Sequence, residues 1–166
     1  EVTRQVSDMV VTDDNFASII AAVEQGRGIY DNIRKTIQYL LAGNTAELVL
    51  MTAAIVSGWP APLLPIHLLW INLITDGLPA LCLATDGISH DVMHQRARER
   101  GARLADRAFL SRLVLAGGAT AAVCLGVYLW QLQVASVETA RSMTFTALVF
   151  CELFKSFSFR SETTPI

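Results

Sequence analysis

Three acidic side chains lie within stretches of sequence that are otherwise apolar, namely Glu47, Asp76 and Glu152. A charged side chain at the centre of a membrane costs about 3 kcal/mol on insertion scales, so such residues face the interior of a helical bundle and are functional candidates. Neutral oxygen donors share helical faces with the first two acids. These donors are Asn44, Asn72 and Thr75.

All of these donor atoms are oxygens, which suit a hard cation such as calcium, with six to eight oxygen ligands at about 2.3 to 2.6 Å. No thiolate or imidazole joins the set, which disfavours a soft metal. The alternative is that the polar residues only pair with one another across the bundle. We predict a metal site and no catalytic or cofactor-binding residue, since no nucleophile triad or phosphate loop is present. The predicted ligands are Asn44, Glu47, Asn72, Thr75, Asp76 and Glu152.

Two residues that weaken a helix follow Asp76 in the second of these stretches. Pro79 cannot donate a hydrogen bond to the carbonyl of Thr75, and Gly77 tolerates unwinding. Freed backbone carbonyls beside carboxylates are how transporters assemble cation sites at mid-membrane. The pattern therefore favours an ion-translocating site.

Four segments that could cross about 30 Å of hydrocarbon as helices must position these residues. The fourth is the weakest, because Glu152 and Lys155 both fall inside it. The sequence predicts an all-α membrane protein of four transmembrane helices in two hairpins, with a cytoplasmic stalk before the first. The predicted divisions are a stalk over residues 1–35, spans over 36–59, 63–85, 109–132 and 142–160, and a basic loop over 86–108.

Basic residues mark one side of the membrane. Six arginines stand between Arg96 and Arg112, whereas only Arg141 is left for the opposite face. Because basic loops stay in the cytoplasm, we expect both chain ends to be cytoplasmic.

The N-terminal segment precedes the first span. Residues 7–12 are expected to form a short strand, and Asp13, Asp14 or Asn15 could cap the helix that follows. A helix from about Phe16 to Val56 would be roughly 60 Å long, so its first half must stand in the cytoplasm. Its apolar positions there need a partner, which suggests a larger cytoplasmic body.

Composition excludes several classes of protein. The 166 residues carry a net charge of -2, which argues against a nucleic-acid partner held by charge. The 3 cysteines are far apart, so neither a disulfide framework nor a cysteine zinc site is expected. The first residues do not resemble a signal peptide, so membrane insertion is expected from internal segments.

The sequence resembles the P-type cation-transporting ATPases, most closely the calcium pumps of the sarco/endoplasmic reticulum type and their bacterial relatives. The stretch from Leu69 to Ala80, LWINLITDGLPA, is similar to the sixth membrane helix of that family nearly residue for residue. The stretch from Asn44 to Glu47, NTAE, resembles the fifth helix. Residues 7–16 and 21–27 resemble the end of the phosphorylation domain and its stalk.

The resemblance implies the C-terminal membrane portion of such a pump, covering helices five to eight. One calcium site would use Asn44, Glu47, Thr75, Asp76 and Glu152. Asn72 and Asp76 would contribute to a second site, completed by a fourth helix that is absent. The phosphorylated Asp-Lys-Thr-Gly sequence and the nucleotide and actuator domains are also absent, so ATP and magnesium would bind only in missing domains.

The predicted function is therefore the cation-translocating segment of an ATP-driven pump, most simply for calcium leaving the cytoplasm, and inactive alone. Expected partners are membrane lipid and the missing parts of the pump, and the location would be the plasma membrane if the protein is bacterial. Alternatives are a non-catalytic four-helix partner or regulator, or the same family with manganese, sodium, potassium or protons. Lys155, one turn after Glu152, is expected to pair with that carboxylate and so to leave one transported cation per cycle.

Overall fold

The chain is described by a computed structural model that covers residues 5–6, 10, 12, 15–88, 90–94 and 106–160. These residues are helical wherever they form regular structure. The elements in chain order are α2 (Phe16–Val56), α3 (Pro65–Trp70), η1 (Ile71–Thr75), α4 (Gly77–Ala84), η2 (His90–Met93), α5 (Arg107–Val134) and α6 (Val137–Arg160). The strand predicted over residues 7–12 lies outside the described residues except for Val10 and Thr12, which form none.

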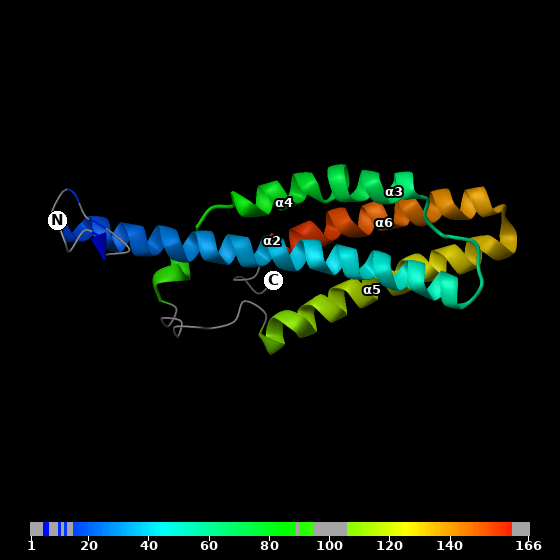
Figure 1. The fold of residues 1–166 in the computed structure, drawn as a ribbon, viewed down its shortest axis with the longest axis horizontal. Helices are drawn as coiled ribbons and strands as arrows, with labels where there is room; N and C mark the ends of the chain where they lie inside the picture. The colour runs from blue at the N-terminus through cyan, green and yellow to red at the C-terminus, as the bar shows by residue number, and fades with distance from the viewer. Residues whose placement is uncertain are drawn as a thin grey trace.

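Helix α2 is the axis around which the other helices pack, and it runs along most of the molecule (Figure 1). Its predicted limits are confirmed at both ends, over 41 residues from Phe16 to Val56. Asn15 is the cap, because its side chain accepts a hydrogen bond from the backbone N–H of Ala17 at 3.0 Å. At the other end the chain leaves the helix through Gly58, which has a positive φ of 70°.

The second predicted span is a broken helix rather than a continuous one. Helix α3 passes into η1, a π-helical segment in which the N–H of Asp76 bonds to the carbonyl of Ile71 at 2.8 Å. Helix α4 then starts at Gly77. The irregularity predicted from Gly77 and Pro79 is therefore present, but it begins before Gly77. Such π segments are frequent at functional sites.

Helices α5 and α6 form an antiparallel hairpin beside α2 (Figure 1). Gly117 brings α5 unusually close to α2, since a Cβ atom on it would lie 2.9 Å from the carbonyl oxygen of Ala42. At the end of the bundle where α2 leads into α3, the Tyr128 hydroxyl donates to the carbonyl of Pro60. Arg141 Nε donates to the carbonyl of Ala61 at 2.8 Å. These bonds join the turn between α2 and α3 to helices α5 and α6.

Three helical segments of the described chain are long and apolar enough to cross a membrane: Phe16–Val56, Pro65–Ala84 and Arg107–Val134. Helix α6 is long enough at 24 residues. It is less apolar than the other three because Glu152, Lys155 and several hydroxyl-bearing residues fall inside it. The fourth predicted span therefore forms as a helix, and its two charged residues Glu152 and Lys155 are buried against the other helices.

The segment after α4 is fixed to the stalk part of α2. Asn32 Nδ2 donates to the carbonyl of Asp86 at 2.7 Å, and Arg27 Nη1 donates to that of Val92 at 3.1 Å. Ile88 packs on Gly28, where a Cβ atom would lie 2.5 Å from Ile88 Cγ1. The first part of the basic loop therefore lies along α2, while residues 95–105 are outside the described part.

Candidate cation site

The three carboxylates singled out by the sequence are buried within the bundle and come from three different helices. Glu47 of α2, Asp76 at the η1–α4 junction and Glu152 of α6 are 7%, 2% and 1% exposed. Burial of three acids in a small bundle is costly unless each is paired or binds a cation. Their hydrogen-bond partners therefore decide what the cluster can do.

Asp76 and Glu152 meet across Gly43 of α2. A Cβ atom placed on Gly43 would lie 3.1 Å from Glu152 Oε2 and 3.3 Å from both Glu152 Oε1 and Asp76 Oδ2. Three carboxylate oxygens thus surround one point beside the helix axis. A methyl group at Gly43 would fit only if these oxygens moved by a few tenths of an ångström.

Glu47 lies near this meeting point and is held by the amide of Asn72. Asn72 Nδ2 donates to Glu47 Oε2 at 3.0 Å and also to the carbonyl of Leu68 at 2.9 Å. The other oxygen, Glu47 Oε1, is buried and has no hydrogen-bond partner. This contact between Asn72 and Glu47 was not predicted from the sequence, and Asn72 itself is largely exposed.

Lys155 is the cation of the cluster. Its Nζ atom donates to Glu152 Oε1 at 2.7 Å, and both side chains are buried. The predicted pairing is confirmed. The second oxygen, Glu152 Oε2, is buried without a partner and is the one nearest the Cβ position of Gly43.

Tyr39 is a member of the site that sequence reasoning missed. Its hydroxyl donates to Asp76 Oδ1 at 3.5 Å, and the side chain is completely buried. The ring also packs edge-on against Phe159, with ring centroids 6.2 Å apart. A tyrosine in an apolar helix is normally read as core, and its only signal was helical spacing, four positions before Gly43.

The two remaining predicted ligands have different surroundings. Thr75 is buried beside Asp76. Asn44, in contrast, is exposed on the face of α2 that the other described helices leave uncovered. The structure therefore brings Glu47, Asn72, Thr75, Asp76 and Glu152 into one region and leaves Asn44 outside it.

The donors do not already form a closed metal cage. Among the described residues no group of three or more His, Cys, Asp or Glu side chains is close enough to hold a metal ion. The two unpartnered oxygens, Glu47 Oε1 and Glu152 Oε2, are acceptors that a cation or a proton would satisfy. The donor set fits an oxygen-binding cation once the helices draw these side chains together.

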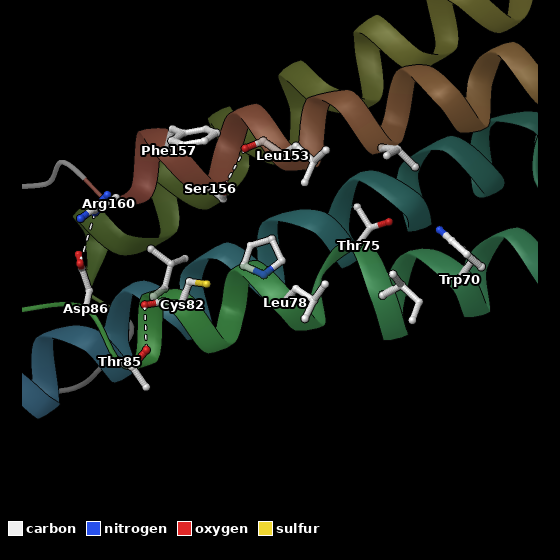
Figure 2. Close-up of a pocket in the computed structure, with 14 residues that line it drawn as sticks. Trp70, Thr75, Leu78, Cys82, Thr85, Asp86, Leu153, Ser156, Phe157 and Arg160 are labelled. Atoms are coloured by element: carbon white, nitrogen blue, oxygen red, sulfur yellow. Dashed lines mark hydrogen bonds and ion pairs between the residues drawn. The ribbon is translucent and has the colours of Figure 1, made fainter.

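A groove of about 740 Å³ runs between α4 and α6 beside the cluster. Figure 2 shows Thr75 and Trp70 toward one end and the ion pair of Arg160 with Asp86, at 3.3 Å, at the other. Leu153 and Phe157 line the α6 side. Most of the lining is apolar, so the groove is not itself a cation site.

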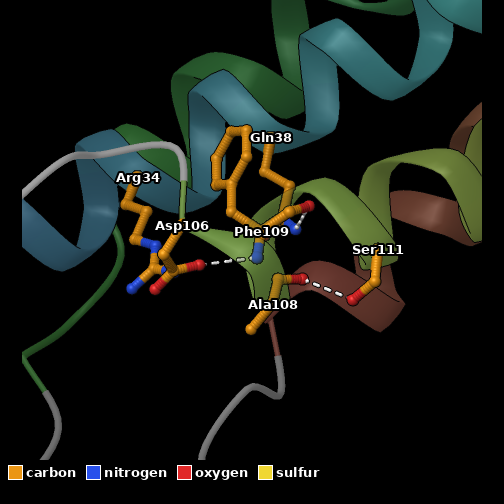
Figure 3. A network of polar contacts seen from close by, with 6 residues as sticks. All are labelled: Arg34, Gln38, Asp106, Ala108, Phe109 and Ser111. Carbon is orange, nitrogen blue, oxygen red and sulfur yellow. Dashed lines mark hydrogen bonds and ion pairs between the residues drawn. The ribbon is translucent and has the colours of Figure 1, made fainter.

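A second polar network joins the start of α5 to α2 on the side of the predicted basic loop (Figure 3). Asp106 accepts from the backbone N–H of Phe109 at 2.7 Å and from Arg34 Nη2 at 2.8 Å. The bond from Phe109, and then Arg34, lower the pKa of Asp106. Gln38 Nε2 donates to the carbonyl of Phe109 at 3.0 Å. This network fixes the level at which α5 meets α2.

Comparison with known families gives a match over residues 60–166 to the family described as "Cation transporting ATPase, C-terminus". The chain is 41% identical to a calcium-transporting ATPase of Bacillus subtilis over 98% of its own length. It is 38% identical to calcium-transporting ATPase 1 of Schizosaccharomyces pombe over 100%, and 32% identical to calcium-transporting ATPase type 2C member 2 of Mus musculus over 98%. It spans only 18% to 19% of the length of these relatives.

Proposed function

This chain belongs to the cation-transporting ATPases, and from that premise we propose that it is the cation-translocating membrane segment of an ATP-driven calcium pump. The observation that carries the proposal is the buried acidic cluster. Glu47 and Glu152 each keep one buried oxygen without a hydrogen-bond partner, next to a π-helical break in the second span. Buried acceptors without a partner are rare in native structures, and a bound cation would satisfy both of them.

The proposed ligands are those predicted from the sequence. Glu47, Asp76 and Glu152 supply negative charge, and Asn72 and Thr75 supply neutral oxygens. Asn44 is proposed on sequence grounds alone, since its side chain is exposed. The all-oxygen donor set is the kind that calcium takes.

Helix α2 provides the route by which events outside the membrane reach the site. One continuous helix carries both the stalk residues and Glu47, so a displacement of the stalk moves Gly43 and Glu47 against Asp76 and Glu152. We propose that phosphorylation elsewhere in the pump drives this displacement. ATP and magnesium would then bind in domains outside this chain, and the ends of the chain would lie on the cytoplasmic side.

The proposal is tested by ion-dependent phosphoenzyme formation in the intact protein. We expect calcium to support phosphorylation from ATP, and Asp76→Asn to abolish that dependence. Glu138→Gln, an exposed acid at the opposite end of α6, is the matched control and should behave like the wild type. Dependence on manganese, sodium, potassium or protons instead would replace calcium as the cargo. Phosphorylation unaffected by Asp76→Asn would refute the site.

The alternative of a non-catalytic four-helix partner is not favoured. The similarity to ATP-driven pumps extends over essentially the whole chain, and it includes the stretch with the π-helical break and Asp76. A regulator that only packs against a pump would have no need for buried carboxylates with unpartnered oxygens.

A further inference from the structure

We propose that Arg141 is a positioning residue of the cation site, because its bond to the turn between α2 and α3 fixes the level at which Glu152 enters the site. The turn consists of residues 57–64. The proposal rests on the function proposed above and adds a determinant of ion affinity that lies outside the ligand set.

The first argument is what the bond connects. Arg141 Nε donates to the carbonyl of Ala61 at 2.8 Å, and both residues are half-buried. A charged donor makes a stronger hydrogen bond than a neutral one. Helix α2, which carries Glu47, ends where the turn begins, and the span that carries Asp76 begins where the turn ends. One bond therefore ties α6, the helix of Glu152, to both elements that bring the other carboxylates.

The turn is stiff enough to transmit a position. Pro60 and Pro62 have restricted backbone torsions, and Pro65 is the first residue of α3. The N–H of Trp59 bonds back to the carbonyl of Ala54 at 3.0 Å. The carbonyl groups of the turn are therefore fixed reference points for α6.

The second argument is a match of lengths along three helices. Each part of the meeting point is eleven positions from a residue at the turn end of its helix: Glu152 from Arg141, Asp76 from Pro65, and Gly43 from Ala54. Eleven helical residues rise about 16 Å, so the three parts share a level only while the helix ends stay level. A slip of α6 by one residue would move Glu152 by about 1.5 Å, more than a binding site tolerates.

Other contacts of α6 define its level less sharply. The rings of His67 and Phe145 lie 4.8 Å apart, but an apolar ring contact is less directional than a hydrogen bond. At the other end of α6, Arg160 pairs with Asp86, and the Arg160 side chain is 68% exposed. Exposed ion pairs contribute little. Arg141 is therefore the contact best able to hold α6 in register.

The test is equilibrium binding of radioactive calcium to the intact protein, with a matched pair of variants. Arg141→Met places a methyl group where Nε stands and removes the bond to Ala61. Tyr128→Phe removes the bond to Pro60 in the same turn, but Tyr128 lies on α5, which carries none of the proposed ligands. Arg141→Lys keeps a charged donor near the carbonyl. Size-exclusion chromatography and thermal unfolding in detergent check the folding of each.

We expect Arg141→Met to weaken calcium binding by about threefold to tenfold, and Arg141→Lys to restore most of the loss. Tyr128→Phe should lower the unfolding midpoint and bind calcium like the wild type. If Arg141→Met fails to fold, Arg141→Gln, with a shorter and neutral donor, replaces it with the same expected weakening.

A double-mutant cycle identifies the group through which Arg141 acts. In a Glu152→Gln background, Arg141→Met should cause a smaller loss of affinity than in the wild type, because the carboxylate that it positions is gone. In a Glu47→Gln background the loss should keep its full size. If Glu152→Gln binds too weakly to measure, the comparison of Arg141→Met with Tyr128→Phe decides.

Two outcomes would overturn this inference alone. They are equal calcium affinities of Arg141→Met and Tyr128→Phe, and a loss from Arg141→Met that is undiminished by Glu152→Gln. Both leave calcium binding by the wild type, and hence the proposed function, intact. Folded wild-type protein that binds no calcium would overturn both proposals.

Discussion

Gly43 of α2 lies directly against the carboxylate of Glu152 on α6, so close that a Cβ atom on Gly43 would stand 3.1 Å from Glu152 Oε2. The same point is 3.3 Å from Asp76 Oδ2. A missing side chain on one helix thus creates the space that two acids from other elements share. If the cluster binds the transported ion, this space is part of the site.

Gly43→Ala should therefore weaken calcium binding by about tenfold or more, because the methyl group fills space that three carboxylate oxygens surround. Equilibrium calcium binding to the intact protein measures this. Gly118→Ala is the control, since a Cβ atom there meets nothing within 4 Å. Equal affinities of the two variants would contradict the proposed role of the space.

Gly117→Ala should reduce stability rather than calcium affinity. A Cβ atom at Gly117 would lie 2.9 Å from the carbonyl oxygen of Ala42, so α5 must move away from α2. Overpacking of this kind costs about 1 to 3 kcal/mol. Thermal unfolding in detergent should show a lower midpoint than for Gly126→Ala, which adds a methyl group in open space. An unchanged midpoint would show that the contact is not tight.

Asn32→Ala should loosen the segment after α4 from the stalk. The variant removes the 2.7 Å hydrogen bond to the carbonyl of Asp86, a contribution of about 1 kcal/mol. Faster proteolysis between α4 and α5 in the intact protein would reveal the change. Glu24→Ala, an exposed change on the same helix, should leave the cleavage rate as in the wild type. Identical cleavage of both variants would argue that other contacts hold the segment.

Asp106 should contribute stability that depends on pH. Its pKa is lowered from the ordinary value of 3.8, so the contribution is complete above that value and is lost as the pH falls through the lower folded-state pKa. Asp106→Ala should therefore lower the unfolding midpoint at pH 7, and the difference from the wild type should shrink in strong acid. A difference that stays the same in strong acid would show that the ionised Asp106 carboxylate is not the source of the effect.

The elements of the fold follow closely from local patterns. Asn15 is a good cap, and no proline occurs between it and Pro60, so the limits of α2 could be read from the sequence. The three acids were recognisable because charge is rare in apolar segments, and the Glu152–Lys155 pair because three positions on a helix are neighbours. These signals all lie within single helices.

The members of the site that were not predicted depend on contacts between helices. Gly43 looks like any helical glycine until the side chains that cross it are known, and Tyr39 looks like an ordinary core residue. Asn44 was placed with Glu47 by spacing, yet three positions still differ by about 60° around a helix, enough to turn one outward. The surroundings of Gly43, Tyr39 and Asn44 are set by how α4, α5 and α6 pack on α2.

The measurement closest to the central claim is equilibrium binding of radioactive calcium to the intact protein without ATP, with Asp76→Asn as the comparison. Asp76 is buried at the break in the second span and shares the space at Gly43 with Glu152. The variant keeps the size of the side chain and removes one charge. We predict saturable calcium binding by the wild type and its loss in folded Asp76→Asn protein. Undiminished binding by the variant would contradict the claim that this cluster holds the transported ion.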